Sequence, residues 1–202
     1  MKGTITSRKD YDQIAIDELE RVGNALNLPK VVIDEAARIF TEAAKAGFTR
    51  GRSIMITVAV SIYVACREMK VPRTIEEISR ATKIDSVELG KAYRALLSKV
   101  KIEVPVMDPK DYVERIGRML NLPDEIIKKA EEIVEQVKKS GYTVGKDPAG
   151  IAGAAIYIAS MDDGKVTQKQ IAEVANVTEV TIRSRYKEIM DLLGLKKDAK
   201  SG

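Results

Sequence analysis

The sequence predicts an all-α protein made of two tandem copies of one five-helix domain. Residues 20–29 read ERVGNALNLP and residues 114–123 read ERIGRMLNLP, so the chain repeats at an offset of 94 residues, which becomes 93 after one deletion. Aromatic residues are only 4% of 202, no Trp occurs, and Ala, Ile, Val, Lys and Glu dominate, as in helices with aliphatic cores. The repeat is far longer than the roughly 20–50 residues of a solenoid repeat, which indicates a duplicated domain.

Helix-start signals locate the helices of the first copy. The patterns Thr74-x-x-Glu77 and Asp85-x-x-Glu88 resemble capping boxes. Gly47 follows an apolar helical pattern, as a helix C-terminal stop does. We expect helices at 11–26, 29–46, 53–69, 74–82 and 85–99.

The second copy carries similar signals. Asp108-Pro109 and Asp147-Pro148 are each typical of an N-cap followed by proline at the first helical position. Thr167-x-x-Gln170 is a further capping-box pattern, and Gly141 corresponds to Gly47. We expect helices at 108–120, 123–139, 147–161, 167–175 and 178–193.

The third helix of each copy is apolar nearly all round, which predicts a position at the centre of a helical bundle. The first domain is then 11–100 and the second 108–195. Residues 101–107, KIEVPVM, form a short linker that contains Pro105. The tail 196–202 is expected to be disordered.

Composition excludes several classes of function. A single cysteine, Cys66, and no histidine rule out a disulfide framework, a cysteine-rich zinc site and His-based catalysis. An enzyme would have to use carboxylates and lysines, and we expect none. The formal charge of +4 permits an acidic partner such as DNA. No apolar run is long enough to span a membrane and the N-terminus lacks a signal core, which predicts a cytoplasmic protein.

The last two helices of the second copy have the outline of a helix-turn-helix, with a short capped helix, a turn and a longer helix. Apolar residues in the longer helix recur with helical spacing and define its buried stripe: Ile182, Tyr186, Ile189 and Leu193. The opposite side carries Val180, Ser184 and Lys187, flanked by Thr181 and Arg183.

This outer face has the chemistry of a DNA reader. Val180 can contact a thymine methyl group, and Arg183 can make a bidentate hydrogen bond to guanine. We expect Thr181 and Ser184 beside them on the base edges. Polar and basic residues nearby are expected on the DNA backbone, where they would fix the register: Gln168, Lys169, Arg185 and Lys187.

The equivalent helix of the first copy has a different outer face. Val180 corresponds to Val87, whereas Arg183 corresponds to Gly90 and Thr181 to Glu88. The comparison indicates a division of labour, in which only the second copy reads base edges.

Basic loops precede both third helices. The first copy has Arg50-Gly51-Arg52, and the second has Gly145-Lys146. A glycine beside a cation at a helix N-terminus can bind a phosphate, although the glycine can equally serve the tight turn alone.

Several segments together resemble one family. The RGRS loop, YVACREMKVPRTIEEI, GKDPAGIAGAAIYIAS and EVTIRSRYKEI are similar to the C-terminal core of archaeal transcription factor B, the homologue of general transcription factor IIB. The resemblance covers about residues 11–195. It implies two cyclin-like repeats that bind promoter DNA bent by the TATA-binding protein.

The resemblance also implies roles for individual residues. Val180 and Arg183 would read an element upstream of the TATA box, with Lys187 one turn later. The loop at Arg50-Gly51-Arg52 would contact DNA downstream of the box, and Arg67 would contact the TATA-binding protein. A lysine pair of the eukaryotic protein maps to Ser86 and Val87, so Lys83 or Lys91 would have to replace it.

The family's N-terminal zinc ribbon, which docks on RNA polymerase, requires ligands that one cysteine and no histidine cannot supply, so no cofactor is expected. We expect a monomer that joins RNA polymerase only in the full assembly. Two alternatives stay open: a cyclin-type protein–protein module and a dimeric repressor. A pure protein binder would present an apolar patch on the outer face of the last helix.

Overall fold

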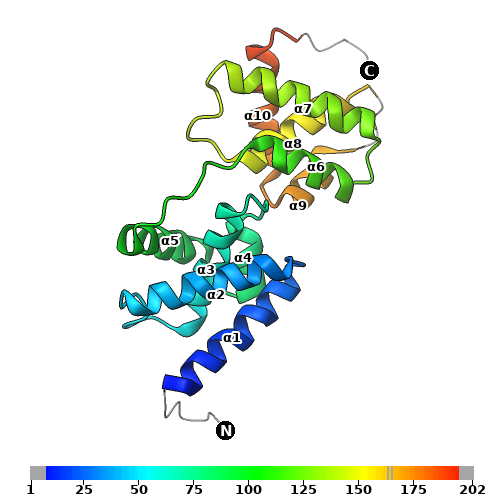
Figure 1. The fold of residues 1–202 in the computed structure, drawn as a ribbon. Coiled ribbons are helices and arrows are strands. Elements are labelled where there is room, and N and C mark those ends of the chain that lie inside the picture. The colour runs from blue at the N-terminus through cyan, green and yellow to red at the C-terminus, as the bar shows by residue number, and fades with distance from the viewer. Residues whose placement is uncertain (1–7, 163, 165, 196–202) are drawn as a thin grey trace. The chain divides into compact units, whose positions relative to one another are not determined.

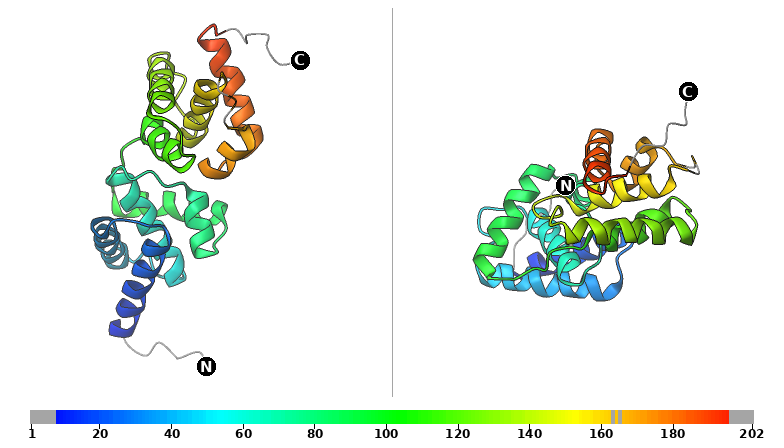
Figure 2. Two further views of the ribbon diagram at one scale, coloured as in Figure 1. Left: turned by 90° about the vertical axis from the view of Figure 1, so that its right-hand side faces the viewer. Right: turned by 90° about the horizontal axis from the view of Figure 1, so that it is seen from above.

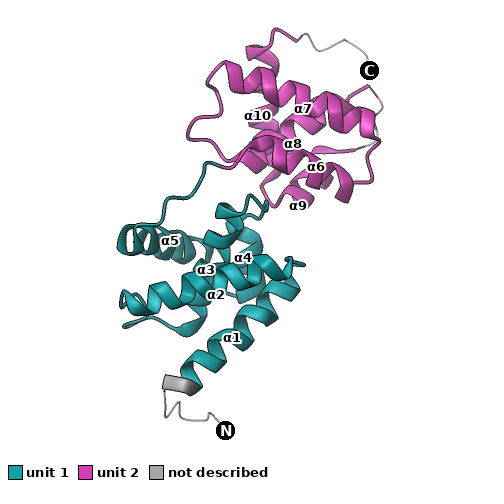
Figure 3. Ribbon diagram, viewed as in Figure 1, with its two compact units in different colours: residues 1–106 teal, residues 107–202 magenta. Residues whose placement is uncertain are grey.

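A computed structural model describes residues 8–162, 164 and 166–195 of the chain. Within these residues it contains ten helices and no strand, which confirms the predicted all-α fold (Figure 1). The chain divides into two compact units, residues 1–106 and 107–202 (Figure 3). The tail predicted for 196–202 lies outside the described residues.

Unit 1 is a bundle around one central helix. Its helices are α1 (Arg8–Ala25), α2 (Lys30–Lys45), α3 (Ile54–Glu68), α4 (Ile75–Thr82) and α5 (Ser86–Val100). As predicted from its apolar sequence, α3 contacts each of the other four helices of this unit, which is the lower bundle in the left view of Figure 2. Cys66 is fully buried in this core.

Unit 2 repeats the arrangement. Its helices are α6 (Pro109–Met119), α7 (Asp124–Lys139), α8 (Pro148–Ser160), α9 (Gln168–Ala175) and α10 (Glu179–Leu192). The central α8 contacts each of the other four. Most of its residues are small, and almost all of them are buried.

Two of the three predicted capping boxes form, whereas Asp85 only accepts from the N–H groups of Val87 and Glu88 at the start of α5. The Thr74 hydroxyl accepts from the backbone N–H of Glu77 at 3.2 Å, and the Glu77 carboxylate accepts from Thr74 N–H at 2.8 Å. Thr167 and Gln170 form the same reciprocal pair at the start of α9. Several predicted helices include their cap as the first residue, because the sequence signal is the cap itself. These helices begin one residue later in the structure, whereas α1 begins at Arg8, three residues before its predicted start.

The segment predicted as a linker, 101–107, is divided between the units. Ile102 and Val104 pack against the core of unit 1, while Met107 is buried in the core of unit 2. Lys101 ends α5 in the left-handed conformation, with φ of 57°. Three of the seven residues of this segment are therefore anchored by apolar contacts, and the bounds of the linker stay a prediction.

Candidate nucleic-acid interface

The helices α9 and α10 of unit 2 form the predicted helix-turn-helix. Asn176 turns the chain in the left-handed conformation, with φ of 57°, and the Thr178 hydroxyl caps α10 by accepting from Thr181 N–H at 3.1 Å. Ile171 and Ile182 are fully buried where the helices meet the rest of unit 2. The apolar corner therefore fixes the direction in which the outer face of α10 points.

That outer face is open to solvent. Val180 is 71% exposed, and Arg183, Ser184 and Lys187 are also exposed. The predicted stripe of Ile182, Tyr186 and Ile189 is buried, and Leu193 is partly buried against the same core. A side chain as apolar as Val180 gains nothing from this exposure in the free protein, whereas the floor of a DNA major groove offers apolar methyl groups.

Arg183 is already engaged by two acceptors. Its Nη2 lies 2.7 Å from Oε1 of Glu179, one turn earlier on α10, and its Nε donates to Oε1 of Gln168 at 3.3 Å. Gln168 is the first residue of α9, so the arginine links both helices of the motif. The sequence indicated the arginine and its exposure but neither of these contacts.

The two residues expected beside the base readers have internal partners. Thr181 is half-buried, and its methyl carbon lies 3.1 Å from where a Cβ on Gly150 of α8 would be. The Ser184 hydroxyl donates to Oε1 of Glu188 at 2.7 Å. Of the four predicted base-reading residues, Thr181 is thus the only one that is half-buried, whereas Val180, Arg183 and Ser184 are exposed.

A hydrogen-bonded network ties the loop before α8 to α10. The Glu188 carboxylate accepts from Ser184, from Nη1 of Arg185 at 2.9 and 3.0 Å, and from the hydroxyl of Tyr142. We call Tyr142, Ser184, Arg185 and Glu188 the Glu188 network. Arg185 was predicted as a DNA-backbone contact, yet it is half-buried and its guanidinium faces inward to this carboxylate.

The network predicts an alkaline limit to stability. Burial and the hydrogen bond to Glu188 raise the pKa of Tyr142 from 10.0 to about 12. Between these pH values the unfolded chain has lost the Tyr142 proton and the folded chain keeps it. The contribution of Tyr142 to the free energy of unfolding is therefore fully present below pH 10 and is lost as pH rises toward 12. Tyr142→Phe should flatten the alkaline loss of stability, measured by denaturant unfolding across that range. An unchanged pH profile would contradict the assignment.

The basic loops before α3 and α8 share one construction. The Arg52 guanidinium lies 4.2 Å from the centroid of the Phe48 ring, and Lys146 Nζ lies 4.1 Å from the centroid of Tyr142. Gly51 and Gly145 occupy equivalent turns with φ of 73° and 72°. Each cation therefore makes a cation–π contact with an aromatic ring, which limits the rotation of its side chain without neutralising its charge.

Other predicted backbone contacts are exposed. Arg50 and Gly51 are exposed in the loop before α3, and Lys169 is exposed in the first turn of α9. Arg52 is also held by a hydrogen bond from its Nη1 to the carbonyl of Phe48 at 2.9 Å. These positions are open to an approaching phosphate.

The residues predicted to contact the TATA-binding protein lie in unit 1. Lys83 follows α4 in the left-handed conformation and Lys91 lies on α5, both exposed. Arg67 is half-buried at the end of α3, and its Nη2 donates to the carbonyl of Pro105 at 3.1 Å. Arg67 thus fastens the segment after α5 to unit 1, a role that no local sequence signal indicated.

Arg67→Ala should loosen this segment. A charge-assisted hydrogen bond of this kind contributes about 1.5–3 kcal/mol, so amide exchange at 102–104 and 106 should accelerate roughly tenfold or more. Hydrogen exchange followed by mass spectrometry measures this, with the exposed Arg94→Ala on α5 as the control. Equal exchange in the two variants would show that the apolar contacts of Ile102 and Val104 suffice.

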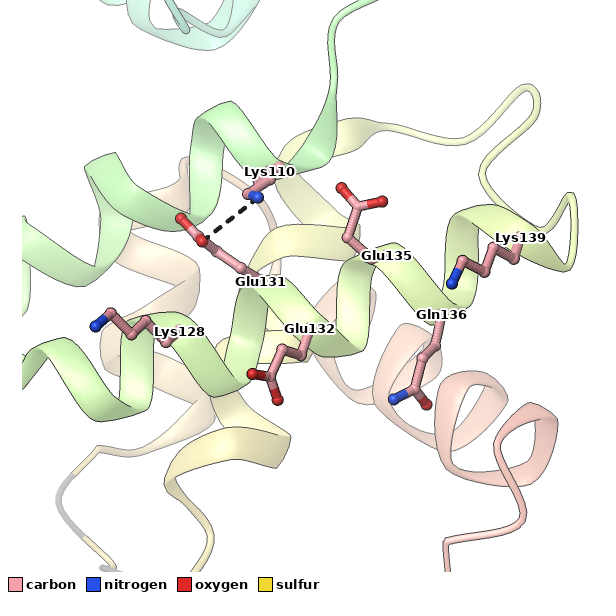
Figure 4. A pocket seen from close by; sticks show the side chains of 7 residues that line it. All are labelled: Lys110, Lys128, Glu131, Glu132, Glu135, Gln136 and Lys139. Carbon is pink, nitrogen blue, oxygen red and sulfur yellow. Dashed lines mark ion pairs between the residues drawn. The ribbon is translucent and has the colours of Figure 1, made fainter.

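A shallow groove between α6 and α7 contains none of the predicted site residues (Figure 4). Its lining consists of three lysines, three glutamates and one glutamine from these two helices: Lys110, Lys128, Glu131, Glu132, Glu135, Gln136 and Lys139. Lys110 Nζ pairs with Glu131 Oε2 at 3.6 Å. The charges largely compensate one another, and the described residues contain no cluster suited to a metal ion.

Comparison with known proteins identifies the family. Residues 9–99 and 102–192 each match the Transcription factor TFIIB repeat. The chain belongs to this family. The two matched segments correspond to the two bundles, so the repeat seen in the sequence is the family's repeat.

Relatives named Transcription initiation factor IIB share this part of the sequence. The chain is 56% identical to the one from Sulfurisphaera tokodaii over 87% of its own length, and 45% identical to the one from Pyrococcus abyssi over 90%. It spans 57% and 62% of those relatives. Their names are those of a transcription factor, in agreement with the expectation of a protein that is not an enzyme. No helix in the described part of the chain is long and apolar enough to cross a membrane.

Proposed function

We propose that this chain is the promoter-binding core of a general transcription initiation factor. Unit 2 reads the DNA element upstream of the TATA box through α10, and unit 1 binds the TATA-binding protein and the DNA downstream of the box. The single observation that carries this proposal is the outer face of α10, where Val180 and Arg183 are exposed at the positions of the family's base-reading motif.

The asymmetry of the units supports a directional role. Gly90 stands at the position of Arg183, so only one unit carries the guanine reader. A complex that reads a sequence on one side of the TATA box has a defined orientation, and this orientation sets the direction of transcription and of polymerase recruitment. The alternative of a pure protein-binding module is disfavoured, because Val180 is surrounded by Arg183, Ser184 and Lys187 and not by an apolar patch.

Binding to bare DNA is expected to be weak. The net charge is only +4, and part of the recognition surface is supplied by the TATA-binding protein and the bend that it imposes.

Arg183→Ala tests the base-reading assignment. It should cost about 1–3 kcal/mol on the preferred upstream sequence and remove the preference there. Arg52→Ala should instead weaken binding whatever the upstream sequence, because a phosphate contact carries no base information. Both are measured by gel-shift titration on TATA-box duplexes with a TATA-binding protein present. An upstream preference that survives Arg183→Ala would contradict the assignment.

A further inference from the structure

The contacts of Arg183 form a set that belongs to unit 2 alone. Glu179 Oε1 and Gln168 Oε1 accept from Nη2 and Nε of the guanidinium at 2.7 and 3.3 Å. These two nitrogens form one edge of the planar group. Among the described residues, no acceptor contacts Nη1. We call Gln168, Glu179 and Arg183 the reading triad.

The free edge of the guanidinium matches a guanine. Arginine has five N–H groups, and the two contacts use one on Nε and one on Nη2. The hydrogens of Nη1 and the second hydrogen of Nη2 remain available. Guanine presents two acceptors, O6 and N7, which require two coplanar donors at fixed spacing.

In unit 1 the equivalent positions also lie close together, but their residues do not form the same hydrogen bonds. The positions equivalent to the reading triad are Ile75, Ser86 and Gly90. A Cβ placed on Gly90 would lie 3.8 Å from Cδ1 of Ile75, so the first residue of α4 also adjoins this position of α5. In unit 1 the first residue of α4 is apolar and position 90 has no side chain, so among the equivalent positions only those of unit 2 hold a cation with two acceptors.

A pair of opposite charges one turn apart on an exposed helix is common and contributes little to stability. The Arg183–Glu179 pair differs because a residue of a second helix holds the same guanidinium. An arginine fixed from two helices loses less rotational freedom when it binds a base than a free one does.

We infer that Gln168 and Glu179 are positioning residues that hold the Arg183 guanidinium with its Nη1 edge toward the DNA. Sequence preference then belongs to the reading triad and not to Arg183 alone. This inference rests on the proposed function. It gives Gln168 a role that differs from the backbone contact expected from the sequence, and it gives a role to Glu179, which the sequence did not single out.

The test compares base preference among variants of the 202-residue chain. The probe is a TATA-box duplex library randomised upstream of the box, bound in the presence of an archaeal TATA-binding protein. Glu179→Ala and Gln168→Ala should each lower the preference at the base pair read by Arg183 by roughly fivefold or more. Affinity for duplexes with the disfavoured base pair should be unchanged or higher for Glu179→Ala, since a carboxylate near phosphates is removed.

The control is Glu173→Gln, which removes an exposed carboxylate from α9 without touching Arg183. It should leave the base preference unchanged. Glu179→Gln keeps an acceptor oxygen and should retain part of the preference. In the Arg183→Ala background, Glu179→Ala should cause no further loss of preference, because the triad acts as a unit.

The possible failures are distinguishable. If Arg183→Ala removes the preference while Glu179→Ala and Gln168→Ala both retain it, the positioning role is wrong and the proposed function stands. If Arg183→Ala itself retains the preference, the base-reading assignment and the reading triad are both wrong. A merely structural pair would lower thermal stability without changing which base is preferred.

Discussion

Phe48→Ala is expected to destabilise unit 1 by about 3–5 kcal/mol, the usual cost of removing a large buried aromatic side chain. Phe48 is fully buried in the core of unit 1, directly before the loop that carries Arg50 and Arg52. Its ring also supports the Arg52 guanidinium at 4.2 Å, and its carbonyl accepts from the same side chain. The substitution therefore removes core packing and the platform of a candidate DNA-backbone contact together.

Phe48→Leu separates the two effects. Leucine keeps most of the buried apolar volume and loses only the aromatic face, so it should cost far less stability while still freeing Arg52. Hydrogen exchange of peptides from unit 1 measures the local stability, and unit 2 serves as the internal reference. If Phe48→Leu costs as much as Phe48→Ala, the ring contact and not the packed volume is what stabilises the loop.

The sequence predicted the helices closely because their signals are local. Thr74 and Glu77 are three residues apart, so their capping box can be recognised without knowing the rest of the fold. The central place of α3 and α8 followed from a property of each helix alone, the lack of a polar face. Comparison of the two copies separated shared features of the fold from the outer face of α10.

The candidate site was predicted only in outline, because its contacts join distant parts of the chain. Tyr142 and Glu188 are 46 residues apart, and Arg67 and Pro105 are 38 residues apart. No pattern in the sequence marks such a pair. Arg183 was identified from its type and helical position. Its contact with Gln168 depends on where the first turn of α9 lies against α10, whereas its contact with Glu179 is local, four residues away on the same helix.

Gly153→Val is expected to lower the stability of unit 2 by about 3 kcal/mol. Gly153 lies in α8 where α9 and α10 pack on it. A Cβ there would be 2.6 Å from Cδ1 of Ile182 and 3.0 Å from Cγ2 of Ile171, both fully buried. Because Ile182 lies beside Arg183 on α10, the displacement needed to relieve the clash would also move the reading face. Binding to the upstream element should weaken along with stability.

The matched control is Gly90→Ala in α5. A Cβ on Gly90 would have its nearest neighbours at 3.6 and 3.8 Å, which is ordinary contact, so this change should stabilise unit 1 by about 0.5–1 kcal/mol through helix propensity alone.

Gly153→Ala gains the same propensity but must displace Ile182 and Ile171, and it should be net destabilising. Unit 1 has Ala59 at the position of Gly153, so the closer approach is specific to the unit that carries the reading helix. Denaturant unfolding measures the change in the free energy of unfolding for both variants. A gain for Gly90→Ala and a loss for Gly153→Ala would establish that the placement of α10 depends on the absence of a side chain at Gly153. Equal gains would mean that Ile182 has room to move.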